Sequence, residues 1–402
     1  MRPFTDTISL DEARRLLTAA ARPLDRIETL PLPALGGRVL AEDVVAAGDV
    51  PPFTRAMMDG YALRAEDTEG ATREEPRTLA LVGQVFTGEV LHGEVGAGQC
   101  VEVATGAPLP GGATAVVMVE DTALAGDRHV QVLAAVRTGQ NVGPAGADIA
   151  RGTVVLQRGD LLLPARVGAL AAVGRAEAAV WAKPRVAIVS TGNEVVAPGQ
   201  ALGPGQIHDV NRHTLSTIVE AHGGLAVPLD VASDTLEALA AAADLAVACD
   251  LVVFSGGSSV GNRDLVMDVL RARGTVAFHG IAMRPGKPTA FGTIDGVPVF
   301  AMPGNPTSCL TNAYVLLVPF LRTLAHLPPH VPHVVTAPLA RRVVSGVGRH
   351  QFYTVRIVDG VAEPAFKASG DISSMAHADG YIEIASEVAA LDAWTAVDVV
   401  LF

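Results

Sequence analysis

The segment 181–326 alternates short, continuously apolar runs with stretches that have the spacing of helices. The runs Val186–Val189 and Leu251–Phe254 lack polar alternation, which is typical of parallel strands covered on both faces. Helices are expected over 211–222 and 234–248. Parallel strands need long crossover connections, and helices usually supply them. The pattern therefore predicts a central parallel-sheet α/β domain.

The rest of the 402-residue chain divides into three regions that differ in their pattern of apolar residues, Gly and Pro. Residues 46–140 contain short Val- and Leu-rich runs broken by Gly and Pro, as in the hairpins of small β domains. They separate 1–45 from 141–180, which we expect to form one discontinuous N-terminal domain. A Pro-rich connector precedes strand-like runs, so 327–402 is expected to be a C-terminal β-barrel-like domain. The predicted fold class is α/β plus β, in an elongated multidomain chain.

Two helix starts are marked by local capping signals. Ser9 followed three residues later by Glu12 has the pattern of a capping box and predicts a helix over 9–21. Ser233 or Asp234 is expected to cap the helix that follows.

Composition narrows the classes of partner and compartment. Thirty basic against 42 acidic residues give a formal charge of -12, which argues against non-specific nucleic-acid binding. The three cysteines form no CxxC pair, so neither a disulfide framework nor a thiolate metal site is indicated. No apolar run approaches the roughly 20 residues of a membrane span. We predict a cytoplasmic protein that binds neither membranes nor nucleic acid.

Three Gly-, Ser- and Pro-rich loops directly follow apolar strands in the α/β domain, at 190–194, 255–261 and 302–308. Ligands of open parallel sheets bind beyond the carboxyl ends of the strands, where small residues let the backbone approach an anion. Any one of these loops could be an ordinary turn, but three in one domain favour an anion or nucleotide site. The candidate binding residues are Ser190, Ser255, Gly256, Gly257, Pro303, Gly304 and Ser308.

Two cations and several carboxylates accompany these loops. Arg284 and Lys287 lie in MRPGKP, where two prolines fix the backbone around them. The carboxylates in loop contexts are Asp59, Asp148, Glu194, Asp234 and Asp264. Phosphate-binding loops together with carboxylates suggest Mg²⁺, although Asp234 and Asp264 could equally be helix caps.

Several common catalytic motifs are absent. The glycines after 255 do not fit GxGxxG, and Gly286-Lys287 lacks the remaining residues of a P-loop. The chain contains no HExxH pair, so zinc-hydrolase chemistry is not supported.

The motifs taken in order resemble the molybdopterin molybdenumtransferase family, the molybdate-insertion enzymes related to the catalytic domain of gephyrin. The segments that carry the resemblance are PPFTRAMMDGYALRAED, EVATGAPLPGGATAVVMVED, GQNVGPAGADI, VAIVSTGNEVVAPGQ, GQIHDVNRHTL, VVFSGGSSVGNRD, AMRPGKPTAFG and AMPGNPTSC. They cover nearly the whole chain. The resemblance implies that the α/β domain is of the molybdopterin-binding type. It also implies a transferase that converts adenylyl-molybdopterin and molybdate into molybdenum cofactor and AMP, with Mg²⁺.

By motif, the resemblance also implies the site residues. The catalytic set would be Asp59, Thr105, Asp148, Glu194, Asp234, Asp264 and Lys287. Mg²⁺ would be held by Asp264, Asp234 and Glu194, while Arg284 and Lys287 would neutralise molybdate or the adenylyl phosphate. Ser308, Ser373 and Ser374 would donate hydroxyls to the oxyanion. The family pattern further implies a homodimer in which Asp59 and Thr105 complete the site across subunits, and contacts with a molybdopterin adenylyltransferase and with apo-molybdoenzymes.

The chain departs from the family pattern at positions that are expected to affect binding of the oxyanion. Arg284 replaces a lysine, Thr354 stands where the family usually has arginine, and Gly143, Ala147 and Val210 each lack a usual polar group. The change at 354 favours one alternative, an inactive or moonlighting gephyrin-like scaffold. A molybdopterin adenylyltransferase is a second alternative, against which the MDGYA and ATGAP segments argue. Tungstate in place of molybdate is a third.

Overall fold

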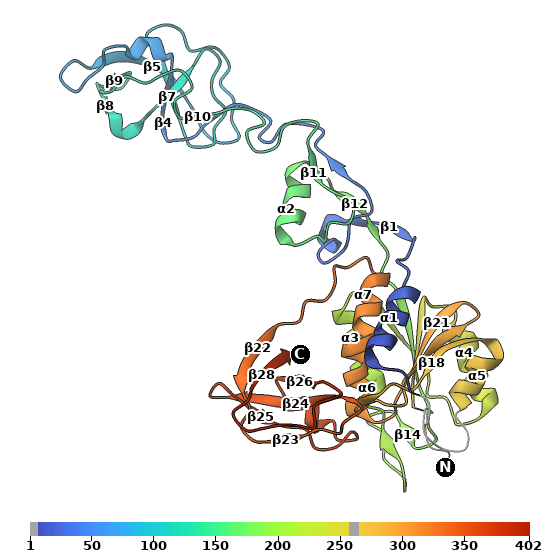
Figure 1. The fold of residues 1–402 in the computed structure, drawn as a ribbon. Coiled ribbons are helices and arrows are strands. Elements are labelled where there is room, and N and C mark those ends of the chain that lie inside the picture. Colours follow the sequence, from blue (N-terminus) through green and yellow to red (C-terminus); the bar gives the residue numbers. More distant parts are fainter. Residues whose placement is uncertain (1–6, 257–264) are drawn as a thin grey trace. The chain divides into compact units, whose positions relative to one another are not determined.

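The computed structural model describes residues 7–256 and 265–402, and these form two compact units (Figure 1). The first unit comprises Met1–Glu28, Gly37–Val39 and Val180–Phe402, and the second comprises Thr29–Gly36 and Leu40–Ala179. Strands β1 (Ile27–Pro31) and β12 (Glu177–Trp181) contain two of the points at which the chain passes between units. The finer division into four domains stays a prediction.

The first unit is built on a six-stranded sheet in the order β16-β13-β17-β21-β20-β18. Four neighbouring strands are parallel, as the apolar runs predicted, and the last two continue the sheet in antiparallel fashion. The bounds are β13 (Arg185–Ser190), β16 (Leu225–Pro228), β17 (Leu251–Ser255), β18 (Gly274–His279), β20 (Ala290–Ile294) and β21 (Val297–Met302).

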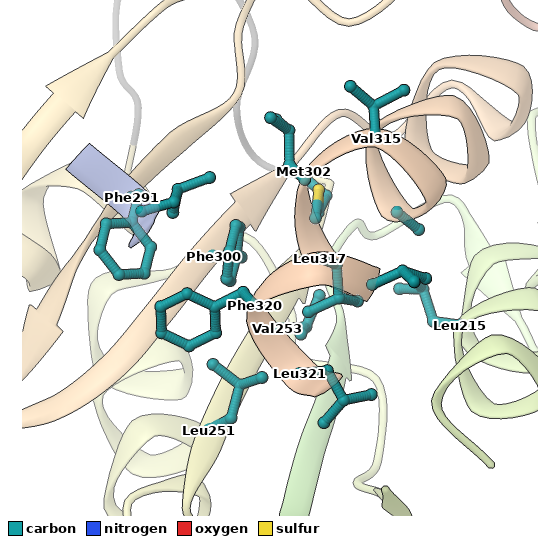
Figure 2. Close-up of a cluster of buried hydrophobic side chains, with 14 of the residues drawn as sticks. Leu215, Leu251, Val253, Phe291, Phe300, Met302, Val315, Leu317, Phe320 and Leu321 are labelled. Carbon is teal, nitrogen blue, oxygen red and sulfur yellow. The ribbon is translucent and has the colours of Figure 1, made fainter. Parts of the chain in front are cut away.

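Helices cover both faces of this sheet, because successive side chains along a strand point to opposite sides. One face packs on α1 (Leu10–Ala20), α3 (Asn211–Ala221), α6 (Pro306–Asn312), the π-helical turn η4 (Ala313–Leu317) and α7 (Val318–Leu324). Figure 2 shows part of this core, in which Phe320 lies near Phe300 and Phe291. The other face packs on α4 (Leu236–Ala246) and α5 (Leu265–Arg273). The α/β prediction is confirmed.

Of the two capping predictions, one is confirmed and one is wrong. Ser9 caps α1 by accepting a hydrogen bond from the backbone N–H of Glu12 at 3.1 Å. Helix α4 begins at Leu236, two residues later than expected, and its cap is Thr235, which accepts from Ala238 N at 3.2 Å. Asp234 instead makes reciprocal hydrogen bonds with Asn193, at the end of β13. The contact of Asp234 with Asn193, which is distant in sequence, therefore takes the place of the expected cap of α4.

The C-terminal part of the first unit forms a second sheet, in the order β19-β24-β26-β28-β22, with β25 paired to β24. Its strands are β22 (Val334–Pro338), β24 (His350–Val358), β25 (Val361–Pro364), β26 (Gly380–Ile384) and β28 (Ala396–Leu401). Short β23 (Val343–Val344) pairs with β27 (Ala390–Leu391), and the helical turn α8 (Ser373–Ala376) precedes β26. The edge strand β19 (Met283–Arg284) comes from the α/β segment and pairs in parallel with β24.

The second unit contains a six-stranded sheet in the order β7-β4-β6-β5-β9-β8. Its strands are β4 (Gly60–Leu63), β5 (Arg77–Val85), β6 (Gln99–Val103), β7 (Ala115–Met118), β8 (Thr122–Leu124) and β9 (His129–Val132). Two small ribbons pair β3 (Arg55–Ala56) with β10 (Val142–Gly143) and β2 (Val44–Val45) with β11 (Val154–Leu156). Helix α2 (Pro164–Ala172) follows. Among the described residues, no helix is long and apolar enough to cross a lipid bilayer.

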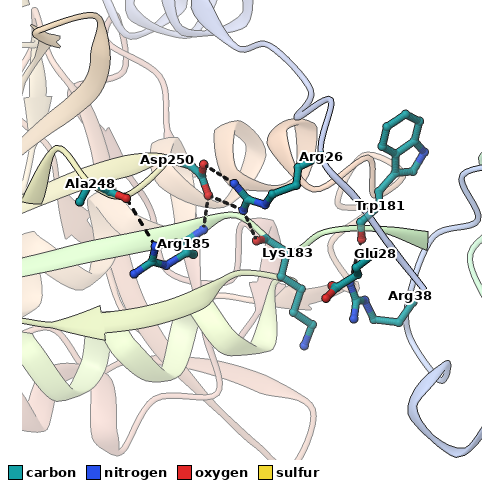
Figure 3. A network of polar contacts seen from close by, with 8 residues as sticks. All are labelled: Arg26, Glu28, Arg38, Trp181, Lys183, Arg185, Ala248 and Asp250. Atoms are coloured by element: carbon teal, nitrogen blue, oxygen red, sulfur yellow. Dashed lines mark hydrogen bonds and ion pairs between the residues drawn. The ribbon is translucent and has the colours of Figure 1, made fainter. Parts of the chain in front are cut away.

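A polar network fixes the starts of two neighbouring parallel strands (Figure 3). Arg26 donates to both carboxylate oxygens of Asp250, at 3.1 and 2.9 Å, and Arg185 N donates to the same carboxylate at 2.7 Å. Asp250 directly precedes β17, and Arg185 begins β13. Burial acts to raise the pKa of Asp250, but the hydrogen bonds from Arg26 and Arg185 outweigh it and lower that pKa. The ionised carboxylate therefore stabilises the fold.

Replacing Asp250 with Asn should lower the free energy of unfolding by about 1 kcal/mol at pH 7, since the ion pair is partly exposed. Because the folded-state pKa is depressed, this contribution is complete above the ordinary aspartate pKa of about 3.9. It is lost as the pH falls through the folded-state value. Urea unfolding of wild type and D250N at pH 7 and at lower pH measures the difference, and a gap independent of pH would contradict the assignment.

Candidate functional site

A cleft of about 750 Å³ lies at the carboxyl ends of the parallel strands. The last residues of β13, β17 and β21 stand side by side, with Ser190 opposite Ser255 and Ser255 opposite Met302. The loops after these strands line the cleft and include most of the predicted binding residues: Ser190, Ser255, Gly256, Pro303 and Gly304. Gly257 lies outside the described residues. The sheet topology thus brings together three loops that are far apart in sequence.

Two buried hydroxyls in this cleft lack an internal partner. Ser190 and Thr191 are each 3% exposed, and neither hydroxyl has a hydrogen-bond partner among the described residues. An unsatisfied buried hydroxyl costs about 1 to 3 kcal/mol, so these groups are suited to a ligand's polar atoms. Ser255 is different, because its hydroxyl accepts from Asn211 Nδ2 at 2.8 Å. The same amide donates to the carbonyl of Gly304 at 2.7 Å and so holds two of the loops together.

Glycine is required where the second loop turns into the cleft. Gly256 has φ +100°, and a Cβ there would lie 2.5 Å from the carbonyl oxygen of Thr191. A side chain at this position would therefore separate two loops that form the cleft wall.

A second pocket, of about 350 Å³, adjoins the cleft and is strongly basic. The two cavities share Pro288, Pro303 and Asn305 as lining residues. The cations that line the smaller pocket are Arg284, Lys287, Arg349 and Lys367, and among the described lining residues there is no carboxylate. Four cations around one small cavity favour the binding of an anion between them. This arrangement is suited to a compact oxyanion of high charge.

The cations come from segments that are distant in sequence. The pairing of β19 with β24 sets Arg284 opposite Gln351, two residues after Arg349. Lys367 follows β25, where its ammonium donates to Ser373 Oγ at 3.1 Å and its backbone N–H donates to Ser374 Oγ at 3.0 Å. The two predicted serines therefore position a cation of the pocket, while Ser308, 4% exposed, lines the pocket itself.

Sequence reasoning missed Arg349 and Lys367. Arg349 lies in GRHQFYT, a segment that was considered only for Thr354. Thr354 is 3% exposed within β24 and does not line the basic pocket. Arg349 could have been identified by its closeness to the MRPGKP segment. That closeness results from the pairing of β19 with β24 and is not visible in the sequence.

Asn312 of α6 holds the loop that carries Lys287 in place. Asn312 Nδ2 donates to the carbonyl of Gly286 at 3.2 Å, and Thr289 Oγ1 donates to the same carbonyl at 2.9 Å. Gly286 has φ +106°, and a Cβ there would lie 2.2 Å from Asn312 Oδ1. Only glycine permits this close approach.

The residues predicted to hold Mg²⁺ are only partly brought together. Glu194 lines the large cleft, whereas Asp234 accepts from the backbone N–H of Asn193 at 3.4 Å. Asp264 lies outside the described residues. Within residues 7–256 and 265–402, no three acidic, His or Cys side chains form a group that could hold a metal. The described residues alone do not make a magnesium site, and Mg²⁺ stays a prediction.

Asp59 and Thr105, 46 positions apart, meet in the second unit. The carboxylate of Asp59 accepts from the backbone N–H of Thr105 at 2.6 Å and from its hydroxyl at 2.9 Å. The backbone hydrogen bond and then the hydroxyl hold the pKa of Asp59 below its usual value. Asp59 also lines a small cavity of about 190 Å³ with Tyr61 and Phe86. Asp148, in the same unit, is exposed and its backbone N–H donates to Val50 O at 3.0 Å.

The structure is that of a multidomain protein with a cleft in an α/β domain and a basic pocket beside it. Three family models match the chain in order: the MoeA N-terminal region (domain I and II) over 8–174, a probable molybdopterin binding domain over 187–323, and the MoeA C-terminal region (domain IV) over 336–402.

Relatives and solved structures agree with these matches. Molybdopterin molybdenumtransferase 2 of Mycobacterium tuberculosis is 36% identical, over 97% of this chain and 98% of its own length. The Haemophilus influenzae molybdopterin molybdenumtransferase is 34% identical, over 84% of this chain and 83% of its own. The crystal structure of the molybdopterin biosynthesis MoeA protein from Pyrococcus horikosii superposes with a TM-score of 0.86 at 39% identity, covering 98% and 99% of the two chains. This chain belongs to the molybdopterin molybdenumtransferase family, the MoeA proteins.

Replacing Thr105 with Val should raise the pKa of Asp59 while leaving it below the ordinary aspartate value. The substitution removes the hydroxyl donor but keeps the backbone N–H. Titration of the side-chain carbons of aspartate by carbon-13 NMR measures the change. Thr153→Val is a matched control, because the exposed Thr153 hydroxyl donates to Ala150 O in the same unit. An unchanged pKa of Asp59 in the Thr105 variant would contradict the assignment.

Proposed function

We propose that this protein is a molybdenum-insertion transferase, which takes adenylyl-molybdopterin and molybdate and releases molybdenum cofactor and AMP. The observation that carries the proposal is the basic pocket that adjoins the large cleft. A pocket with four cations is matched to a doubly charged oxyanion such as molybdate. The adjoining cleft, with its unpartnered hydroxyls, has the size expected for a small-molecule site.

The geometry supports a division of roles between the two cavities. Ser190 and Thr191 would bind polar groups of adenylyl-molybdopterin in the larger cleft. Arg284, Lys287 and Arg349 would hold molybdate beside it, so that the two reactants meet in one orientation. When the bond between the adenylyl phosphorus and its bridging oxygen breaks, negative charge accumulates on the separating phosphates. Lys287, which lines the smaller pocket next to the shared residue Pro288, would neutralise part of this charge.

Further parts of the proposal rest on the sequence and on family membership. We infer a Mg²⁺ requirement, with Glu194, Asp234 and Asp264 as the carboxylates that would supply oxygen ligands. We also infer a cytoplasmic homodimer, with contacts to a molybdopterin adenylyltransferase and to apo-molybdoenzymes. The assignment of Asp59, Thr105 and Asp148 to catalysis belongs to the same set of inferences. Light scattering of the purified protein tests the dimer directly.

Single-turnover release of AMP from protein loaded with adenylyl-molybdopterin and Mg²⁺ tests the central proposal. Molybdate should accelerate the release, and Lys287→Ala should slow it by about 10² to 10³, as expected when a charge-stabilising donor is removed. Arg349→Gln should reduce the apparent affinity for molybdate about tenfold, the effect of one charge-assisted hydrogen bond. Arg356→Gln is the matched control, since Arg356 is exposed on β24 and lines neither cavity.

The same assay separates the alternatives. The absence of AMP release, with both substrates shown to be bound, would contradict the insertion proposal and leave a scaffold role. Formation of adenylyl-molybdopterin from ATP would instead indicate an adenylyltransferase. Replacing molybdate with tungstate, at matched concentrations, measures the preference between the two oxyanions.

A further inference from the structure

A separate cavity of about 530 Å³ lies in the first unit, between α1, α7 and the connector that follows α7. It shares no lining residue with the cleft or the basic pocket. Leu17, Leu316 and Phe320 form its floor and are at most 4% exposed. Figure 2 shows Phe320 beside Phe300, so the floor is continuous with the core of the α/β domain. A cavity of this size with an apolar floor fits a small organic ligand.

The walls of this cavity carry two arginines and two histidines. Arg14, Arg322, His326 and His330 line it, and among the described lining residues there is no carboxylate. Arg14 is already paired with Glu383, at 3.5 Å, and with Asp11. Arg322 differs, because the only described hydrogen bond of its guanidinium runs from Nε to the carbonyl of Pro328, at 2.9 Å.

The half-buried Arg322 therefore lacks an anionic partner in the part of the chain that the structure describes. Burial lowers the pKa of Arg322, which is the direction expected for a cation without a counter-ion. Burial also lowers the pKa of His330, and the nearby charge of Arg322 lowers it further. His222, edge-on to His330 at 5.1 Å, has its pKa lowered to about 4 by burial, by His330 and by Arg322. The lowered pKa values favour the neutral forms of His330 and His222, and Arg322 is the cation of the cavity wall that has no carboxylate partner among the described residues.

One wall of the cavity has an irregular backbone. Val315 and Leu316 belong to η4, where the helix widens to π-helical hydrogen bonding before α7. Such π-helical turns are rare in proteins, and they occur frequently at functional sites. The arginine Arg322, the apolar floor and the π-helical turn η4 therefore all line the same cavity.

We propose that this cavity binds a medium-chain monocarboxylate, with its hydrocarbon chain against Leu17 and Phe320 and its carboxylate on Arg322. The apolar floor would take the chain out of water, at about 0.8 kcal/mol for each buried methylene. The guanidinium fork matches a carboxylate in geometry and charge. Failure of this proposal would leave the insertion reaction unaffected, because the two sites have no residue in common.

Trp181 offers a direct readout of binding. Its indole stacks on the His326 ring, with centroids 4.0 Å apart and an interplanar angle of 5°. The chain has two tryptophans, so Trp394→Phe leaves Trp181 as the single reporter. Octanoate titrated into this full-length variant should change the emission of Trp181 in a saturable manner and raise the melting temperature. Octylamine, with the same chain and the opposite charge, should do neither.

Three variants in the same background test the assigned contacts. Arg322→Gln should weaken octanoate binding at least tenfold, as expected for the loss of a charge-assisted pair. Thr18→Phe, at an exposed position of the cavity rim, should abolish binding by filling the space without disturbing the core. Arg15→Gln is the control, because Arg15 is exposed on the same helix, pairs with Glu12 and does not line the cavity.

Three results would overturn the proposal. The first is the absence of a saturable response to octanoate in the Trp394→Phe protein. The second is equal binding of octylamine, or binding that persists in Thr18→Phe; this second test holds even if Arg322→Gln does not fold. The third is a change of molecular mass in solution caused by Thr18→Phe, which would indicate that the cavity is covered by a second copy of the chain.

Discussion

The pairing of β19 with β24 is the interaction on which the basic pocket depends. The two residues of β19, between β18 and β20 of the α/β segment, join the edge of the C-terminal sheet and set Arg284 close to the start of β24. Arg349 and Lys367 then converge on the loop that carries Lys287. Like charges would separate if they were on flexible segments, so the strand pairing and the Gly286–Asn312 contact must hold them in place. The fold thereby maintains a charge cluster that an anion can complete.

Some polar groups near the sheet ends are internally paired, as the Asn211 amide nitrogen is with Ser255 and Gly304. The hydroxyls of Ser190 and Thr191 are buried exceptions in the large cleft. In the separate apolar cavity, the half-buried Arg322 lacks an anionic partner among the described residues, although it donates to Pro328 O. A buried polar group without a partner lowers stability, and both exceptions lie where a ligand could restore the missing contact.

Local sequence signals predicted elements better than they predicted contacts. The capping box at Ser9 gave the first helix correctly, because its donor and acceptor are three residues apart. The same reasoning failed at Asp234, where Asn193 competes for the carboxylate from the end of another strand. The loops at 190, 255 and 302 were predicted to form one site, because strands of a parallel sheet end at one edge. That rule is topological, so it could be applied without coordinates.

By itself, the sequence determined the α/β class, the β character of the remaining regions, the loops of the cleft and membership of the family. These properties depend on periodicity, on glycine and proline positions and on motif order, all of which are local. Only the tertiary structure decided that Arg349 and Lys367 join Arg284 and Lys287, that Asp59 meets Thr105, and that Arg322 faces an apolar cavity. Each of these depends on contacts between residues far apart in the chain, and such contacts are fixed by packing and strand register rather than by local pattern.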